Sequence, residues 1–332
     1  MIADKKSSTL TFFCIRALFF GTGISYAILS LKQDAWIAIL IAFAVGFLML
    51  ILKEKINNFT HFKIIRLLFA SFLLLYAILS MQTFIANFFL DKTPAWVIIL
   101  PLIWLVYVVC KKGLKTITRV AQCFLPISTL LLVTTYITLG PMIKFDNFLP
   151  VFDNNWLEII KCGLMLGIIG IAPIFLIAKK HQESKKVFVF SFGTIFLIVI
   201  CIIGVLGHRI ASIYQYSEYI VLKKIVIFDF LEKMENILSI TWILDLFILM
   251  SLSSYVVKDI LETRSKNLAF KIYLVIMALL AIILCKWVSP FDFGMGFSYI
   301  LLGFILLILL LGAIELVIGD AKITRRVKLD EY

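Results

Sequence analysis

The sequence predicts an all-α polytopic membrane protein with ten transmembrane helices, and composition, length and charge distribution each point to that fold class. Of its 332 residues, 62% are apolar and 16% are charged, and the mean hydropathy is +1.07. Soluble domains are roughly 45–50% apolar and about 25% charged. A membrane-spanning helix takes about 20 apolar residues, so ten of them would use most of the chain. We therefore expect a single transmembrane domain over residues 1–332.

The ten expected spans are the apolar windows that lie between clusters of charged residues. Their approximate bounds are 10–31, 35–52, 64–90, 94–110, 119–139, 157–178, 187–208, 230–256, 268–288 and 297–319. The first window is too long for the apolar region of a signal peptide and lacks a small-x-small cleavage site. We therefore expect it to remain in the mature protein.

The basic residues predict the orientation of these spans. When connecting segments are assigned alternately to the two sides, most of the 32 Lys and Arg residues fall on the side of the two terminal tails. Because basic segments are retained in the cytoplasm, we expect an integral inner-membrane protein with both termini cytoplasmic. The net charge of +12 is then mostly a topology signal. No soluble surface suited to base stacking accompanies it, so we expect no nucleic-acid partner.

Cysteine and histidine usage excludes several kinds of site. The six cysteines show no C-x-x-C spacing, and His61, His181 and His208 fall at span edges without a second metal ligand nearby. We therefore expect neither a metal site nor a cofactor. An intramembrane hydrolase or acyltransferase would need a buried nucleophile, histidine or pair of acids. The lack of a histidine in mid-span therefore argues against an enzyme.

Two outer segments are long for this chain. Gly140 to Trp156 contains prolines and paired asparagines, which predicts a loop, and we expect Phe148, Phe152 and Trp156 to anchor it at the membrane interface. Glu218 to Asn236 alternates apolar and charged residues at helical spacing, which predicts an amphipathic helix on the outer leaflet. A solvated connector would have a similar pattern and stays an alternative.

Glycines indicate an interruption in span one. Gly21-Thr22-Gly23-Ile24 lies near its middle, where two glycines within three residues make a continuous helix costly. Unwound backbone is tolerated at membrane depth only where it is buried in protein or lines a cavity. We therefore expect this segment to face a ligand. The alternative is close packing of a neighbouring helix against the glycines.

Span six has a related pattern. Gly163, Gly167 and Gly170 share one helical face and are followed by Pro173, which removes a helix hydrogen bond. Interrupted helices at positions one and six of ten match the inverted repeats of secondary transporters, in which half-helix ends face a ligand near the bilayer midplane. Glycine-mediated helix packing is again the alternative.

Span three carries a polar stripe. Tyr76, Ser80, Thr83 and Asn87 recur at i, i+4, i+7 and i+11, which places four hydrogen-bonding groups on one face. Such a face avoids lipid, and it either lines a water-filled path or packs into the bundle. Gln82 falls off the stripe, and we expect it to form a structural hydrogen bond.

Span eight carries an acid at mid-helix. Asp245 follows Trp242 by about one turn. A carboxylate at the bilayer centre costs about 2.5–3.5 kcal/mol on insertion scales, which implies that Asp245 has an interaction partner or a function. We expect Asp245 to bind a ligand amine or a proton, and the alternative is a structural hydrogen bond to a neighbouring helix. Arg16 lies near the cytoplasmic end of span one, where we expect its side chain to reach the membrane interface.

Four segments carry a resemblance to a known family. They are GTGI at 21–24, QDAWIAIL at 33–40, FLPVF-x-x-x-W at 148–156 and EYIVLKKIVIFDFLEKMENILSITWIL at 218–244. On these motifs the chain resembles the spore germination permease family, the B-type membrane subunits of germinant receptors in endospore-forming bacteria. The resemblance runs over nearly the whole length, and the last segment is its most specific part.

The resemblance implies a fold, a location and partners. It implies the ten-span, five-plus-five inverted repeat of the amino acid–polyamine–organocation superfamily, a leucine-transporter-like fold, in the spore inner membrane. It also implies a germinant-sensing role beside an A-type subunit and a lipoprotein C-type subunit. The sequence departs from the family pattern in span six, where Ile171 follows Gly170 in place of the usual acid. No ligand role for an acid is therefore expected there.

The function we expect is non-enzymatic sensing of a small amino-acid-type ligand between spans one, three, six and eight. The expected site residues are Gly21, Thr22, Gly23, Ile24, Tyr76, Ser80, Thr83, Asn87, Gly167, Gly170, Trp242 and Asp245. A proton-coupled amino-acid transporter is the first alternative, because sensing and transport need the same pocket. A scaffold that only anchors partner subunits is the second.

Overall fold

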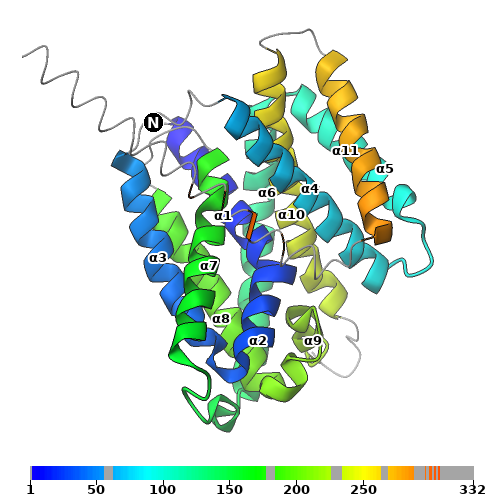
Figure 1. The fold of residues 1–332 in the computed structure, drawn as a ribbon. Coiled ribbons are helices and arrows are strands. Elements are labelled where there is room, and N and C mark those ends of the chain that lie inside the picture. Colours follow the sequence, from blue (N-terminus) through cyan, green and yellow to red (C-terminus); the bar gives the residue numbers. More distant parts are fainter. Residues whose placement is uncertain are drawn as a thin grey trace, which may run out of the picture.

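The computed structural model describes residues 2–55, 63–176, 184–225, 234–262 and 268–287, with a few isolated positions between 296 and 306. Within these ranges the protein consists of helices joined by turns and loops, without a strand. Figure 1 shows the long helices standing side by side as a bundle, with α1 (Ile2–Leu18) and α10 (Met234–Glu262) passing through its middle. The all-α architecture is therefore confirmed.

Seven stretches of the described chain are long and apolar enough to cross a bilayer, judged by length and composition. One of them, Ser8–Ile51, runs over 44 residues and covers the first two expected spans, and the fourth expected span is the shorter apolar helix Ala95–Lys111. The tenth expected span, 297–319, lies outside the described residues apart from isolated positions. The count of ten spans and the inverted repeat therefore stay predictions.

The remaining long helices differ in how deeply they are buried. They are α3 (Ala35–Lys55), α4 (Lys63–Phe88), α5 (Ala95–Lys111), α6 (Leu114–Leu139), α7 (Trp156–Leu176), α8 (Ser184–Ala211) and α11 (Leu268–Trp287). In the most apolar windows of α7 and α10, 83% and 72% of residues are buried, against 28% for α11. The interior of the bundle is thus built around α7 and α10, and α11 lies at its periphery.

The first span consists of two helices separated by a break. α1 ends at Leu18, the break covers Phe19–Gly23, and α2 (Ile24–Leu31) continues beyond it. Phe20 has a ψ of 132° and Gly21 a φ of 80°, so neither residue is helical. The interruption predicted from the two glycines is confirmed.

Small residues let α3 and α7 approach closely. A Cβ on Gly163 would lie 2.6 Å from Ile41, and one on Gly167 would lie 2.8 Å from the carbonyl oxygen of Ala42. Because lipid provides no hydrophobic force between helices, such close van der Waals contact is what holds a membrane helix pair together. The expected interruption of span six is wrong, since α7 stays helical through Pro173 to Leu176. Glycine-mediated packing, the alternative, accounts for Gly163 and Gly167.

The loop between α6 and α7 is hydrogen-bonded to the start of α3. The Asp34 carboxylate accepts hydrogen bonds from the backbone amides of Phe152, at 2.9 Å, and Asn154, at 3.0 Å. The rings of Phe152 and Trp156 stack with centroids 4.8 Å apart and are about half exposed. Such half-exposed rings suit the predicted position at the membrane interface.

The segment expected to lie on the outer leaflet instead begins by turning inward. It starts with α9 (Ser217–Leu222), a six-residue helix that packs against α8 and α10. Five of its six residues, including Glu218 and Tyr219, are buried. The expectation of a surface amphipathic helix is therefore wrong for this first turn, because its polar residues Ser217 and Glu218 are buried together with its apolar ones. Residues 226–233, the middle of that segment, lie outside the described residues.

Candidate functional site

The break in the first span forms the centre of the candidate site. Gly21 has a positive φ, a conformation that residues with a Cβ rarely adopt. A Cβ at this position would also lie only 2.3 Å from the indole of Trp242 on α10. Two independent constraints, backbone conformation and close contact, thus require glycine here. The non-helical backbone is buried within protein, as membrane depth demands.

Glu218 of α9 contacts the backbone of the break. Its Oε1 accepts a hydrogen bond from the backbone amide of Gly21, 197 residues away in the sequence. The side chain is almost fully buried, and the burial raises the pKa of its carboxyl to about 7 in spite of this hydrogen bond. Sequence analysis did not place Glu218 in the site. The available signal was an isolated acid in front of the apolar run Tyr219–Leu222.

Thr22 connects the break to the polar stripe of α4. Its hydroxyl donates a hydrogen bond to the carbonyl oxygen of Leu18, at 2.9 Å, and also bonds the hydroxyl of Tyr76. Because the threonine hydrogen is already used, Tyr76 is the donor in the second bond. Two of the predicted site residues from different spans are thus in direct contact.

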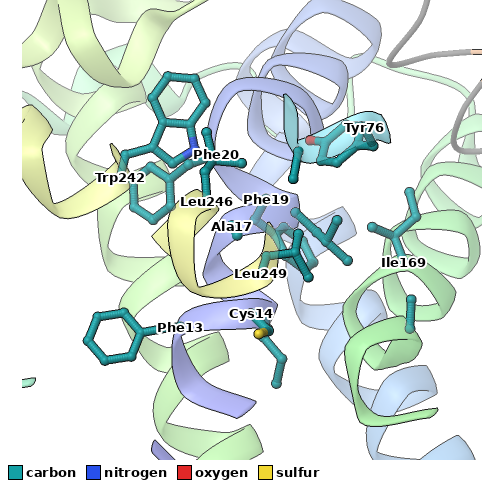
Figure 2. Packing of buried hydrophobic residues seen from close by; sticks show 14 of the residues in the cluster. Phe13, Cys14, Ala17, Phe19, Phe20, Tyr76, Ile169, Trp242, Leu246 and Leu249 are labelled. Atoms are coloured by element: carbon teal, nitrogen blue, oxygen red, sulfur yellow. The ribbon is translucent and has the colours of Figure 1, made fainter. Parts of the chain in front are cut away.

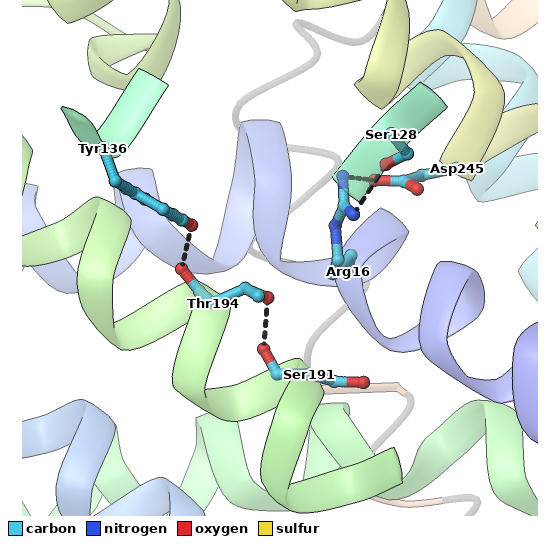
Figure 3. Close-up of polar contacts among 6 residues, drawn as sticks. All are labelled: Arg16, Ser128, Tyr136, Ser191, Thr194 and Asp245. Carbon is cyan, nitrogen blue, oxygen red and sulfur yellow. Dashed lines mark hydrogen bonds and ion pairs between the residues drawn. The ribbon is translucent and has the colours of Figure 1, made fainter. Parts of the chain in front are cut away.

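A buried ion pair lies about one helical turn before the break, near the end of α1. The Arg16 guanidinium is 2.9 Å from the Asp245 carboxylate and donates a second hydrogen bond, at 3.0 Å, to Ser128 Oγ of α6 (Figure 3). Both side chains are fully buried, and the guanidinium also lies 4.8 Å from the centre of the Phe12 ring. The expectation that Arg16 reaches the membrane interface is wrong. Asp245 is buried as expected, and its charged partner is Arg16, which the sequence had not connected with it.

Aromatic side chains surround the break on the side of α9. Phe84 of α4 and Trp242 of α10 meet edge to face with ring centroids 4.2 Å apart, and Phe84 also contacts Tyr216 and Tyr219. Figure 2 shows Trp242 beside Phe20 of the break. A pocket of about 40 Å³ lies among these rings. It is lined by Phe20, Phe84, Glu218, Tyr219 and Trp242, with hydroxyls from α6 and α10.

The other predicted site residues lie at different distances from this centre. Ile24 begins α2 and is fully buried, and Ser80 and Thr83 are buried on α4. Gly170 lies against Phe19 of the break, since a Cβ there would be 3.0 Å from its ring. Asn87, by contrast, is exposed.

Two further expectations concern packing and metals. Gly167 packs on α3, as described above, and so lies away from the pocket. Gln82, expected to be structural, accepts hydrogen bonds from the Thr83 hydroxyl and the Cys285 thiol. Among the described residues, no group of three or more His, Cys, Asp and Glu side chains could hold a metal ion.

A known protein family matches the part of the chain that contains nearly all of these elements. A family model described as "Spore germination protein" matches residues 6–290, a range that includes the break, the ion pair, α9 and Trp242. The chain belongs to the spore germination permease family. A similar protein is the "Putative spore germination protein YfkT" of Bacillus subtilis (strain 168), which is 27% identical over 277 residues, covering 73% of this chain and 77% of the relative.

Membership defines the general nature of this spore germination permease. The family consists of membrane proteins of the permease or receptor type and is not an enzyme family. Together with the apolar helices, membership makes the chain an integral membrane protein with a role in spore germination. The resemblance noted in the sequence is therefore confirmed.

Proposed function

We propose that this protein is the membrane subunit of a spore germinant receptor and that it binds a small amino-acid-type germinant at the break in its first span. The observation that carries the proposal is the buried break at Phe19–Gly23, non-helical at Phe20 and Gly21, beside a pocket. A break in a helix frees backbone amides and carbonyls from helical hydrogen bonds, and these groups can bind the charged ends of an amino acid.

The proposed assembly follows from the family. The subunit sits in the spore inner membrane with both termini in the cytoplasm, and it works beside an A-type and a lipoprotein C-type subunit. Its fold is the ten-span, five-plus-five inverted repeat, with Gly21, Thr22, Gly23 and Tyr76 at the ligand. Germinant binding would favour one of two conformations of the bundle and so transmit the signal, because a ligand shifts an equilibrium only by its difference in affinity for the two states.

Deleting the gene from the spore-forming host tests this function. Spores lacking it should lose their response to at least one amino acid in a panel, measured as the fall in optical density on germination. Reintroducing the wild-type gene should restore that response, and an epitope-tagged copy should co-purify the A-type and C-type subunits. An unchanged response to every amino acid in the panel would contradict the proposal.

A further inference from the structure

We propose that Glu218 binds the ammonium group of the ligand, so that this subunit selects compounds that carry a primary ammonium group. The inference deepens the proposed function and rests on it for the identity of the ligand as a germinant. It assigns a specific recognition role to a residue on α9, outside the long helices.

The two oxygens of the Glu218 carboxylate have different surroundings. Oε1 accepts the hydrogen bond from the Gly21 amide. Oε2 is buried and makes no hydrogen bond of good geometry among the described residues, and the residue as a whole is only 5% exposed. The neighbouring Ser217 hydroxyl and the backbone of Glu218 itself lie near the carboxylate, but neither supplies a positive charge. A buried carboxylate oxygen without a partner is costly, so such a group usually has a ligand or a function. Because Glu218 lines the pocket, a bound ammonium group can supply the missing partner.

The walls of the pocket also favour a cation. Phe20, Phe84, Tyr219 and Trp242 line it together with Glu218. Aromatic faces attract ammonium groups, most strongly where water is excluded. The volume of about 40 Å³ is several times what one water molecule needs, and it suits an ammonium group with its first carbon. Carboxylate and rings together thus form a small site for a positive charge.

No protein cation already neutralises this carboxylate within the described ranges. Arg16 is paired with Asp245, and the ion pairs there include none to Glu218. Lys223, at the end of α9, places its ammonium group 5.2 Å from the centre of the Tyr219 ring. We therefore infer that a bound ligand supplies the positive charge that pairs with Glu218. Because Oε1 accepts the Gly21 hydrogen bond, a cation bound at Oε2 would be connected to the backbone of the break through a single carboxylate group.

Binding of three small probes to the purified full-length protein tests the assignment. Ethylammonium carries only the cation, propionate only the anion, and glycine both. At pH 8, ethylammonium and glycine should raise the melting temperature in a saturable way, and propionate should not. Glu218→Gln preserves shape and an oxygen acceptor for Gly21 but removes the charge, so it should weaken the affinity for both ammonium probes by at least about tenfold.

The controls separate this assignment from a general loss of structure. Glu158→Gln makes the same chemical change at an exposed acid on α7 and should bind all probes like the wild type. Glu218→Asp keeps the charge and should retain part of the affinity. Equal ethylammonium binding by wild type and a folded Glu218→Gln protein, or binding of propionate in its place, would overturn the assignment. Probe binding that depends on Glu218 in a protein whose deletion leaves germination unchanged would instead reject only the proposed function.

Discussion

At the scale of single residues, three charged side chains are buried where the first span breaks. Arg16 and Asp245 neutralise each other, while Glu218 is bonded to a backbone amide and has no countercharge among the described residues. A buried ion pair must offset the cost of removing two charges from water, and it seldom adds much net stability. A single buried acid is costlier still, which is why Glu218 and not Asp245 is assigned to the ligand.

The ion pair can be tested by removing one partner and then both. Asp245→Asn leaves the Arg16 guanidinium without a countercharge, and we expect it to lower the free energy of unfolding by about 3–5 kcal/mol. Arg16→Met with Asp245→Leu replaces the pair by apolar side chains and should recover most of that loss. Thermal melting of the detergent-purified proteins measures both effects.

The same variants decide whether Asp245 has a role in ligand recognition. If the double variant is stable and spores carrying it germinate normally, the pair is structural. If the double variant is stable but its spores no longer respond to the germinant, the charge of Asp245 takes part in recognition, as the sequence analysis expected.

Glu218 should make the stability of the free protein depend on pH. Burial raises the pKa of its carboxyl from 4.5 to about 7, so between these pH values the folded protein holds a proton that the unfolded chain releases. The free energy of unfolding should therefore fall by about 3 kcal/mol as the pH rises from 4.5 to 7, and Glu218 should add no further change above pH 7. Tyr216 also faces the carboxyl, but burial raises the pKa of its phenol, which therefore keeps its proton throughout this pH window.

Comparison with Glu218→Gln isolates this effect. The difference in melting temperature between wild type and variant should change in the window from pH 4.5 to 7 and stay constant above it. If the difference in melting temperature were the same at all these pH values, the Glu218 carboxyl would have the same pKa in the folded and the unfolded protein.

At the scale of elements, α1, the break and α2 form a hinge-like segment whose shape depends on Gly21. Its positive φ and the nearby indole of Trp242 exclude a side chain. Gly23, by contrast, has helical dihedral angles, and a Cβ there would lie 3.1 Å from the Phe19 ring, 3.3 Å from the Leu18 carbonyl oxygen and 3.4 Å from Leu166 of α7. The two glycines are therefore not equivalent in the structure, although the sequence treats them alike.

Leucine substitutions test this difference. Gly21→Leu should abolish the germinant response, because leucine neither adopts this backbone conformation easily nor fits beside Trp242. Gly23→Leu should cause a smaller loss, since its backbone is already helical and its nearest neighbours, the Phe19 ring and the Leu18 carbonyl oxygen, need to shift by only a few tenths of an ångström. Membrane levels by immunoblot control for insertion, and germination of complemented spores gives the response. A normal response from well-inserted Gly21→Leu would contradict a role for the break.

At the scale of the whole molecule, the question is whether the bundle only senses its ligand or also transports it. A sensor needs different affinities in two conformations, whereas a transporter must also release the ligand on the far side of the membrane. α7 is continuous and packs tightly on α3, so of the two spans predicted to be interrupted only the first is broken within the described residues, whereas transporters with this kind of repeat use both. The kink at Gly207 lies near the C-terminal end of α8 and belongs to neither of these two spans. This asymmetry favours sensing.

Purified protein in liposomes tests this prediction. It should bind labelled glycine saturably and accumulate none under an imposed proton or sodium gradient. Gly21→Leu liposomes serve as the control for binding at the break. Gradient-driven uptake by wild type that the variant lacks would instead establish the transporter alternative.

The sequence by itself determined the properties that depend on local composition. Apolar windows predicted a helical membrane protein, two glycines within three residues predicted the break, and an acid within an apolar helix predicted a buried Asp245. Only the tertiary structure decided which groups meet. It brought Glu218 to the Gly21 amide across 197 residues, paired Arg16 with Asp245, and used Gly163 and Gly167 for packing. Burial and helix breaking follow from neighbouring residues, whereas the partner of a buried charge depends on how helices pack, and no local pattern records that packing.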